Sequence, residues 1–266
     1  MPFIIGRKQD HKLWDYIIGD IHGREWPSSI AVDRYQYLRK FAWKYGDNFK
    51  LSFRDPNTGA WAKWLPFPHL LWDNGITATV DVHRSVLENE IVIESDYPTY
   101  EENYNASRII GTIIENKGFI PHYYYSGNKS IHIHVFLDWE FIIKKIKYTE
   151  QIIIDSKYLK NDEAFKRDFI NWLREKMISC WDTQARQFDR DLIRANHLIR
   201  AELSKNKKGF KTFLGYSIKD VSFIPIVCNE SNLIYPKLGE IKVSLPTSSD
   251  ELIEEFVNHL EAISRK

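Results

Sequence analysis

The segment 119–138 constrains the fold most, because its composition predicts two strands joined by a tight turn. Aromatic and β-branched residues stand on both sides of the polar turn Ser126–Lys129, whose small residues suit a chain reversal. Side chains alternate between the two faces of a strand, so Ser130, His132 and His134 are expected to share one face. Hydroxyl and imidazole groups beside a turn that carries a lysine can hold phosphate oxygens.

Two acids, Glu94 and Asp96, end the apolar segment that begins at Ile91. If this segment is a strand, both carboxylates project from the same face. Neighbouring carboxylates repel each other unless a cation lies between them, and Mg²⁺ and Mn²⁺ prefer oxygen ligands. The pair therefore predicts a divalent metal site. The alternative is a solvated strand end before the turn at Pro98.

A basic segment extends from Arg190 to Lys219. It contains eight Lys and Arg residues and two acids, Asp191 and Glu202, so its net charge is 8 − 2 = +6. The whole chain has a formal net charge of only +1. A nearly neutral protein that concentrates positive charge in one segment has a candidate phosphate-binding surface there.

The order of the expected elements predicts an α+β fold with an antiparallel or mixed sheet that carries helices. Helical spacing of apolar residues predicts helices over 29–45, 99–117 and 162–180, and from Ser249 to the end. Gly118 is expected to stop the second of these helices. A turn at 55–59 predicts a hairpin, and 88–96 and 197–203 are expected to contain strands.

Composition indicates an ordinary globular protein, with 43% hydrophobic and 27% charged residues. The two cysteines, Cys180 and Cys228, lie far apart and indicate neither a disulfide framework nor a structural zinc site. The first residues do not form a signal peptide, and no apolar run reaches the length of a membrane span. We therefore expect a soluble, cytoplasmic protein with no membrane partner.

In their order and spacing, these motifs resemble those of the archaeo-eukaryotic primase superfamily, which includes primase small catalytic subunits and primase-polymerases. That family has an acidic pair after a strand and a Ser-Gly-x-x-Gly-x-His element. A third acid then precedes Leu-Ile-Arg-x-Pro-x-Ser-x-x-x-Lys-Thr-Gly. The matching segments here lie within residues 94–212 and differ in having Glu94 first in the acidic pair, Ser130 for a glycine, and Ala201 and Glu202 near the family's proline.

The resemblance implies a DNA-templated nucleotidyltransferase, a DNA primase or primase-polymerase that makes or extends primers by two-metal phosphoryl transfer. It implies catalytic roles for Glu94, Asp96, Asp189 and His132, with the three acids holding Mg²⁺ or Mn²⁺. Asp191 remains an alternative third acid. The residues implied to bind the nucleotide are Ser126, Lys129, Ser130, His132, Arg200 and Lys211.

The resemblance also implies the architecture and the partners. We expect an N-terminal α/β subdomain, residues 1–90, packed on an RRM-like catalytic subdomain, residues 91–266, that ends in a helix and lacks a zinc insert. The expected partners are a DNA template and primer, ribo- or deoxyribonucleoside triphosphates, and a large primase subunit or helicase. The preferred sugar is left open.

Two other functions use the same residues. His132-Ile-His134 is a His-hydrophobe-His element, as in replication-initiator nucleases that nick DNA with a tyrosine. Against a nuclease, the basic segment and the Ser126–Lys129 turn would have no role. A primase-like accessory subunit that is catalytically weak is the third reading, prompted by Glu94 in the acidic pair.

Overall fold

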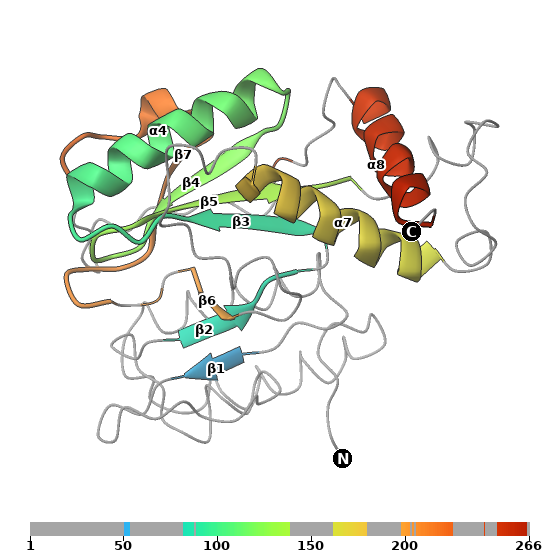
Figure 1. The fold of residues 1–266 in the computed structure, drawn as a ribbon. Coiled ribbons are helices and arrows are strands. Elements are labelled where there is room, and N and C mark those ends of the chain that lie inside the picture. The colour runs from blue at the N-terminus through green and yellow to red at the C-terminus, as the bar shows by residue number, and fades with distance from the viewer. Residues whose placement is uncertain are drawn as a thin grey trace, which may run out of the picture.

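A computed structural model describes residues 51–53, 82–87, 89–138, 162–179, 198–202, 204, 206–225, 242 and 249–264. These residues form two antiparallel sheets and three α-helices (Figure 1), so the predicted α+β class is confirmed for this part of the chain. None of the helices described is both long and apolar enough to cross a membrane.

A four-stranded sheet lies at the centre. Its strands, in spatial order, are β3 (Glu90–Glu94), β5 (Ile131–Phe136), β4 (Pro121–Tyr125) and β7 (Thr212–Gly215). Because β5 lies between β3 and β4 and is antiparallel to both, β3, β4 and the helix between them form a split β-α-β unit. The predicted hairpin of β4 and β5 is confirmed.

Helix α4 (Tyr100–Asn116) connects β3 to β4 and begins at a capping box. The Thr99 hydroxyl accepts a hydrogen bond from Glu102 N at 3.2 Å, and the Glu102 carboxylate accepts one from Thr99 N at 3.0 Å. Gly118, with a φ of 82°, follows the last turn in the left-handed conformation that favours glycine. The predicted helix over 99–117 and its stop at Gly118 are therefore confirmed.

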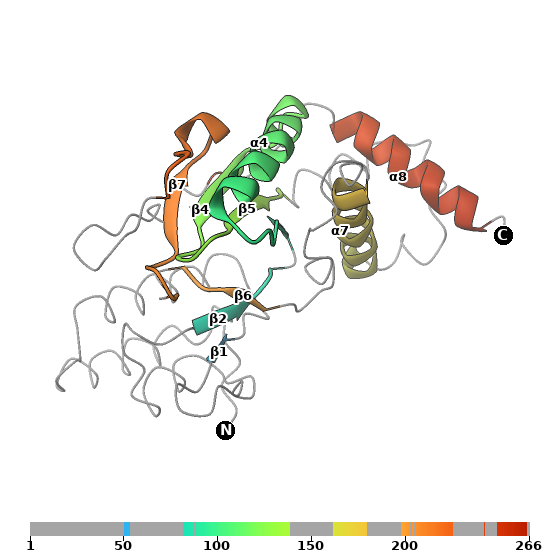
Figure 2. The ribbon, with the colours of Figure 1, turned by 60° about the vertical axis from the view of Figure 1, so that its left-hand side comes forward.

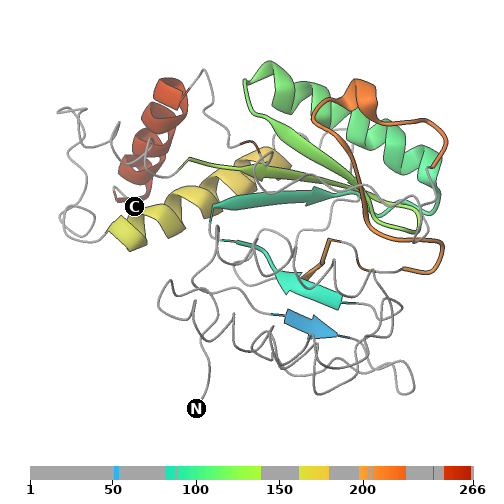
Figure 3. The same ribbon diagram turned by 180° about the vertical axis from the view of Figure 1, so that it is seen from behind.

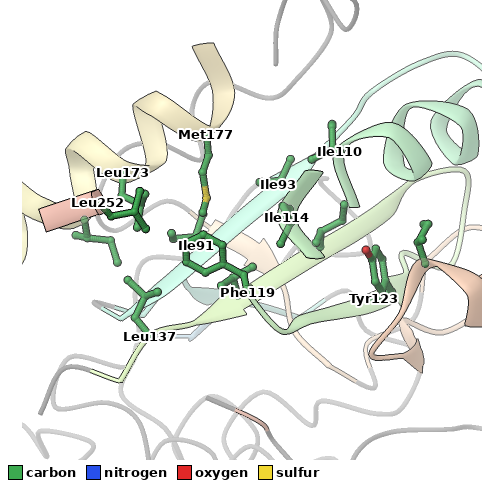
Figure 4. Packing of buried hydrophobic residues seen from close by; sticks show 14 of the residues in the cluster. Ile91, Ile93, Ile110, Ile114, Phe119, Tyr123, Leu137, Leu173, Met177 and Leu252 are labelled. Carbon is green, nitrogen blue, oxygen red and sulfur yellow. The ribbon is translucent and has the colours of Figure 1, made fainter. Parts of the chain in front are cut away.

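The hydrophobic core lies between one face of the sheet and the helices (Figure 4). Ile91 and Ile93 of β3 pack with Ile110 and Ile114 of α4, and each of these side chains is buried. Burying one such side chain contributes about 1.5–3 kcal/mol. Since strand side chains alternate, the neighbouring positions Glu90, Val92 and Glu94 face away from this core.

Helices α7 (Asp162–Ser179) and α8 (Ser249–Ser264) complete the helical layer. Figure 2 shows α7 between α4 and α8, with α8 running obliquely to α7. Phe169 and Phe256 meet edge to face with their ring centroids 5.2 Å apart. Both helices were expected from their apolar spacing, and both are confirmed.

A second sheet lies on the side of β3 away from α4 and α7, as Figures 1 and 3 show. It consists of β1 (Leu51–Phe53), β2 (Val82–Ser85) and β6 (Leu198–Arg200). Strand β6 comes from the expected 91–266 subdomain, and it pairs with β2 of the expected 1–90 subdomain. The two expected subdomains therefore share a sheet. The helix predicted over 29–45 and the turn at 55–59 lie outside the described residues.

Candidate active site

The face of the sheet turned away from the core carries a row of polar side chains. The register places Glu94 of β3 opposite His132 of β5, and His132 opposite Tyr124 of β4. One step along the strands, Val92 lies opposite His134. The predicted alignment of His132 and His134 on one face is confirmed by their stacked rings, whose centroids are 6.1 Å apart.

Glu94 is held as a carboxylate by its neighbours. Its Oε1 is 3.3 Å from His132 Nε2, and its side chain is 21% exposed. Burial raises the pKa of Glu94, but the interaction with His132, a hydrogen bond from Ser130 and the charge of Lys211 outweigh it and lower the pKa to about 2. Glu94 is therefore ionised at neutral pH.

His132 is buried, with 3% of its surface exposed. Its Nδ1 has no hydrogen-bond partner among the described residues. Burial, together with the charges of Lys211 and Arg200, lowers the pKa of His132, whereas Glu94 opposes this shift. A buried ring nitrogen without a hydrogen-bond partner destabilises the fold unless a ligand or water forms a hydrogen bond with it. His132 thus has a free position for a polar ligand.

Asp96 and Lys129 form an ion pair at the exposed edge of the site, with Lys129 Nζ 2.9 Å from Asp96 Oδ1. The Asp96 side chain is 67% exposed, and exposed ion pairs contribute about 0–1 kcal/mol. A ligand can therefore replace either partner at little cost.

Asn103 of α4 joins the two segments that carry this ion pair. Its Nδ2 donates to Tyr97 O at 3.0 Å and to Lys129 O at 3.1 Å, and its Oδ1 accepts from Tyr97 N at 3.0 Å. Asn103 is fully buried. In the sequence, nothing distinguished Asn103 from the other polar residues of this amphipathic helix.

Hydrogen bonds between Ser126 and Ser130 close the Ser126–Lys129 turn. Ser126 N donates to Ser130 O at 2.9 Å, and Ser130 N donates to Ser126 Oγ at 3.1 Å. Both serines are buried: the Ser126 hydroxyl closes the turn, and the Ser130 side chain hydrogen-bonds to Glu94 from inside the protein. Lys129 is the member of this turn that reaches the surface beside Asp96.

The loop 206–209 of the basic segment packs against this turn. Asn206 Nδ2 donates to Ser126 O at 3.2 Å, and Lys208 N donates to Gly127 O at 3.0 Å. A Cβ on Gly127, whose φ is 82°, would lie 2.4 Å from Gly209 O. Glycine at 127 is therefore required both by the backbone and by the close approach of the loop. Lys207 and Lys208 are exposed there.

A buried charge network lies beneath the row and joins the two sheets. Arg84 of β2 donates to Glu90 Oε2 at 2.7 Å and to Glu202 Oε2 at 2.8 Å. All three side chains are buried, and the charges of Glu90 and Glu202 offset the desolvation of Arg84. Glu202 therefore points inward to Arg84, and its negative charge is neutralised within the protein.

Lys211 belongs to the same network. Its ammonium donates to Arg200 O at 2.8 Å, lies 3.1 Å from His134 Nε2 and 3.4 Å from Glu202 Oε1, and is 1% exposed as a residue. On the other side of His134, Nδ1 is 2.5 Å from Glu90 Oε1. Burial and the Lys211 charge lower the pKa of His134 to about 3, so its ring is neutral.

The structure thus gathers most of the predicted site residues on one side of the sheet. Glu94, Asp96, Lys129, Ser130 and His132 are within one cluster of contacts, and Arg200 is close enough for its charge to act on His132. Asp189 and Asp191 lie outside the described residues. The sequence analysis did not identify Arg84, Glu90 or Asn103.

Glu94 and Asp96 fit a divalent cation by their chemistry. Both supply hard oxygen donors, Glu94 is ionised, and Asp96 already accepts a cation in the form of the Lys129 ammonium. Within the described residues, no group of three or more His, Cys, Asp or Glu side chains could hold a metal ion.

No protein family and no curated protein matches this sequence. The structure is similar to the catalytic domain of primase Repb' in complex with initiator DNA. The two chains are 12% identical, the match covers 82% of this chain and 89% of that chain, and the TM-score is 0.40. At this identity and TM-score we base no functional conclusion on the similarity.

Proposed function

We propose that this protein is a DNA-templated nucleotidyltransferase, a primase or primase-polymerase, and that the Glu94–His132 row with the Asp96–Lys129 pair is its active site. The observation that carries the proposal is the contact of an ionised carboxylate, Glu94, with the buried imidazole of His132, whose other nitrogen, Nδ1, has no partner among the described residues. Beside them lie an exposed carboxylate, Asp96, and a half-buried ammonium, Lys129. Phosphoryl transfer needs this combination of metal-binding oxygens and phosphate-binding cations.

Each residue has a role that its surroundings allow. Glu94 and Asp96, with Asp189, would hold Mg²⁺ or Mn²⁺. When bound, these ions offset the charge of the phosphates and activate the 3′-hydroxyl of the primer. A neutral His132 donates its Nε2 proton to the ionised Glu94, so its Nδ1 would accept a hydrogen bond from a donor group of the nucleotide. Lys129 would leave Asp96 for the triphosphate. Arg200 suits a bidentate phosphate contact.

The same geometry disfavours the nicking nuclease. In a His-hydrophobe-His metal site, both imidazoles must offer a nitrogen to one metal ion. Here both ring nitrogens of His134 are engaged, by the Glu90 carboxylate and by the Lys211 ammonium. A cation at His134 would have to displace a buried lysine.

Primer extension tests the proposal directly. A labelled primer on a DNA template, and the template without primer, are incubated with Mg²⁺ or Mn²⁺ and with ribo- or deoxyribonucleotides. Wild type is compared with Asp96→Ala and with the control Glu101→Ala, which removes an exposed acid from the first turn of α4. We expect synthesis by wild type and Glu101→Ala and none by Asp96→Ala.

The other outcomes separate the rival functions. Equal synthesis by Asp96→Ala and wild type would overturn the active-site assignment. If no variant makes product, a covalent protein–DNA adduct would identify a nicking nuclease. DNA binding with neither product nor adduct would identify an accessory subunit. The sugar of the products and any synthesis without primer distinguish primer synthesis from repair synthesis.

A further inference from the structure

We infer that Lys211 is a positioning residue that holds Arg200 in place from inside the protein, and that it does not contact the nucleotide. The inference rests on the proposed function, since it concerns how Arg200 is presented to a triphosphate. It departs from the expectation, drawn from the primase resemblance, that Lys211 binds the nucleotide itself.

The surroundings of Lys211 leave its ammonium no proton for a ligand. A lysine ammonium has three donors, and the structure provides three acceptors: Arg200 O at 2.8 Å, His134 Nε2 at 3.1 Å and Glu202 Oε1 at 3.4 Å. The Tyr124 ring lies under the same nitrogen, 4.9 Å away. To reach a triphosphate, Lys211 would have to leave all four partners.

His134 is set to accept from Lys211 by a second contact. Glu90 Oε1 is 2.5 Å from His134 Nδ1, and an ionised carboxylate can only accept. His134 therefore carries its proton on Nδ1 and offers the lone pair of Nε2 to Lys211. The chain Glu90–His134–Lys211 thus runs from β3 through β5 to the main chain of β6.

The shortest contact of Lys211 is the one that bears on the site. It fixes the carbonyl of Arg200, at the end of β6, and so fixes the backbone from which the Arg200 side chain extends. The positive charge of Arg200 contributes to the lowered pKa of His132, the residue that faces Glu94. Glu202, two residues later, is held by Arg84 and by Lys211, which anchors the same segment at a second point.

A double-mutant cycle on the full chain tests the inference. The nucleotide KM and kcat are measured for wild type, Lys211→Met, Arg200→Ala and the double variant. Lys211→Met keeps an unbranched side chain of similar length without the ammonium, and Lys219→Met, at an exposed lysine of η3 (Ile218–Asp220), is the control. We expect Lys211→Met to raise KM roughly tenfold with kcat less affected, as for the loss of one charged hydrogen bond.

The double variant gives the decisive result. If Lys211 acts through Arg200, adding Lys211→Met to Arg200→Ala raises KM no further. If the two increases multiply, Lys211 contributes independently and the inference is wrong. A Lys211→Met variant that loses only stability, with an unchanged KM once folded, would also overturn it.

A measurement that needs no activity separates this inference from the proposed function. The ¹⁵N shifts of the His134 ring report which nitrogen carries the proton. We expect the proton on Nδ1 in wild type, and a changed Nε2 shift in Lys211→Met but not in Lys219→Met. A proton on Nε2 in wild type would contradict the contact with Lys211, whether or not the protein makes nucleic acid. Wild type with the expected tautomer but no nucleotide binding would reject both the proposed function and the positioning role.

Discussion

Arg84 and Glu202 form a buried, two-contact ion pair, although 118 residues separate them in the sequence. Arg84 also contacts Glu90 through both Nη atoms, at 2.7 Å each. The two carboxylates and the guanidinium together join the second sheet to the four-stranded sheet. The candidate site is therefore stabilised by the Arg84–Glu90–Glu202 network, whose residues belong to none of the sequence motifs.

Replacing Arg84 should lower the free energy of unfolding more than replacing any one of its partners. Arg84→Met leaves Glu90 and Glu202 buried without their common counterion. Breaking a buried pair in this way typically costs about 3–5 kcal/mol. Urea unfolding of Arg84→Met, with Arg108→Met on the exposed face of α4 as the control, measures the loss. A loss below about 1 kcal/mol would mean that the network does not support the fold.

Asp96→Ala should abolish primer extension and leave the stability nearly unchanged. The Asp96 side chain is 67% exposed, and its ion pair with Lys129 lies at the surface. Losing such a pair changes the free energy of unfolding by about 1 kcal/mol or less. Thermal unfolding and extension are measured on the same preparation, so that a misfolded variant is recognised.

Asn103→Ala should impair activity by misplacing two segments at once. The amide holds both Tyr97, next to Asp96, and Lys129. Asn105→Ala, two residues further along α4 and exposed, is the matched control. We expect at least a tenfold lower kcat/KM for Asn103→Ala with the control unchanged, since a small displacement of positioning groups can cost about a hundredfold. Equal activities would show that the turn and the acidic segment hold their places without Asn103.

Stability should fall as the solution becomes acidic. Burial lowers the pKa of His134 to about 3 and that of His122 to about 4, both below the value of 6.5 in the unfolded chain. Below pH 6.5 the unfolded state therefore binds more protons than the folded state, which favours unfolding. Between pH 6.5 and the pKa of the folded state, each histidine lowers the free energy of unfolding by up to about 1.4 kcal/mol per pH unit. Urea unfolding at pH 7.5, 6 and 5 measures the slope, and a flat profile would contradict the buried, neutral rings.

Gly127→Ala should disturb the contact between the turn and the basic loop. Gly118→Ala is the control, because Gly118 has the same φ of 82°. Positive φ alone costs an alanine about 1–2 kcal/mol. The additional loss of unfolding free energy in Gly127→Ala measures the cost of placing its Cβ against Gly209 O. Equal losses in the two variants would mean that the loop moves aside freely.

The sequence predicted the local elements well because their signals are local. The isoleucine stripe of α4 and the alternation in Ile131–Phe136 each depend on spacing within one segment. The same alternation correctly placed His132 and His134 on one face.

The charged residues were harder to interpret, since net charge does not reveal which partners meet. Lys211 and Glu202 were counted in a basic segment, yet both point into the protein and contact each other. Arg84 and Glu90 gave no recognisable motif. Their burial depends on β2 pairing with β6 and on β3 packing beside that sheet, which no local pattern specifies.

The pairing of β2 with β6 has a consequence for synthesis on the ribosome. Arg84 lacks its partner Glu202 until the nascent chain has emerged beyond residue 202, and Glu202 lacks its own partner Lys211 until the chain has emerged beyond residue 211. Until then, β3 can pair with the β4–β5 hairpin and pack against α4, but Arg84 has no contact with Glu202. A product cut short before Leu198 would thus contain both acidic and histidine motifs, yet would lack Glu202, the second counterion of Arg84, and Lys211, the partner of His134 Nε2.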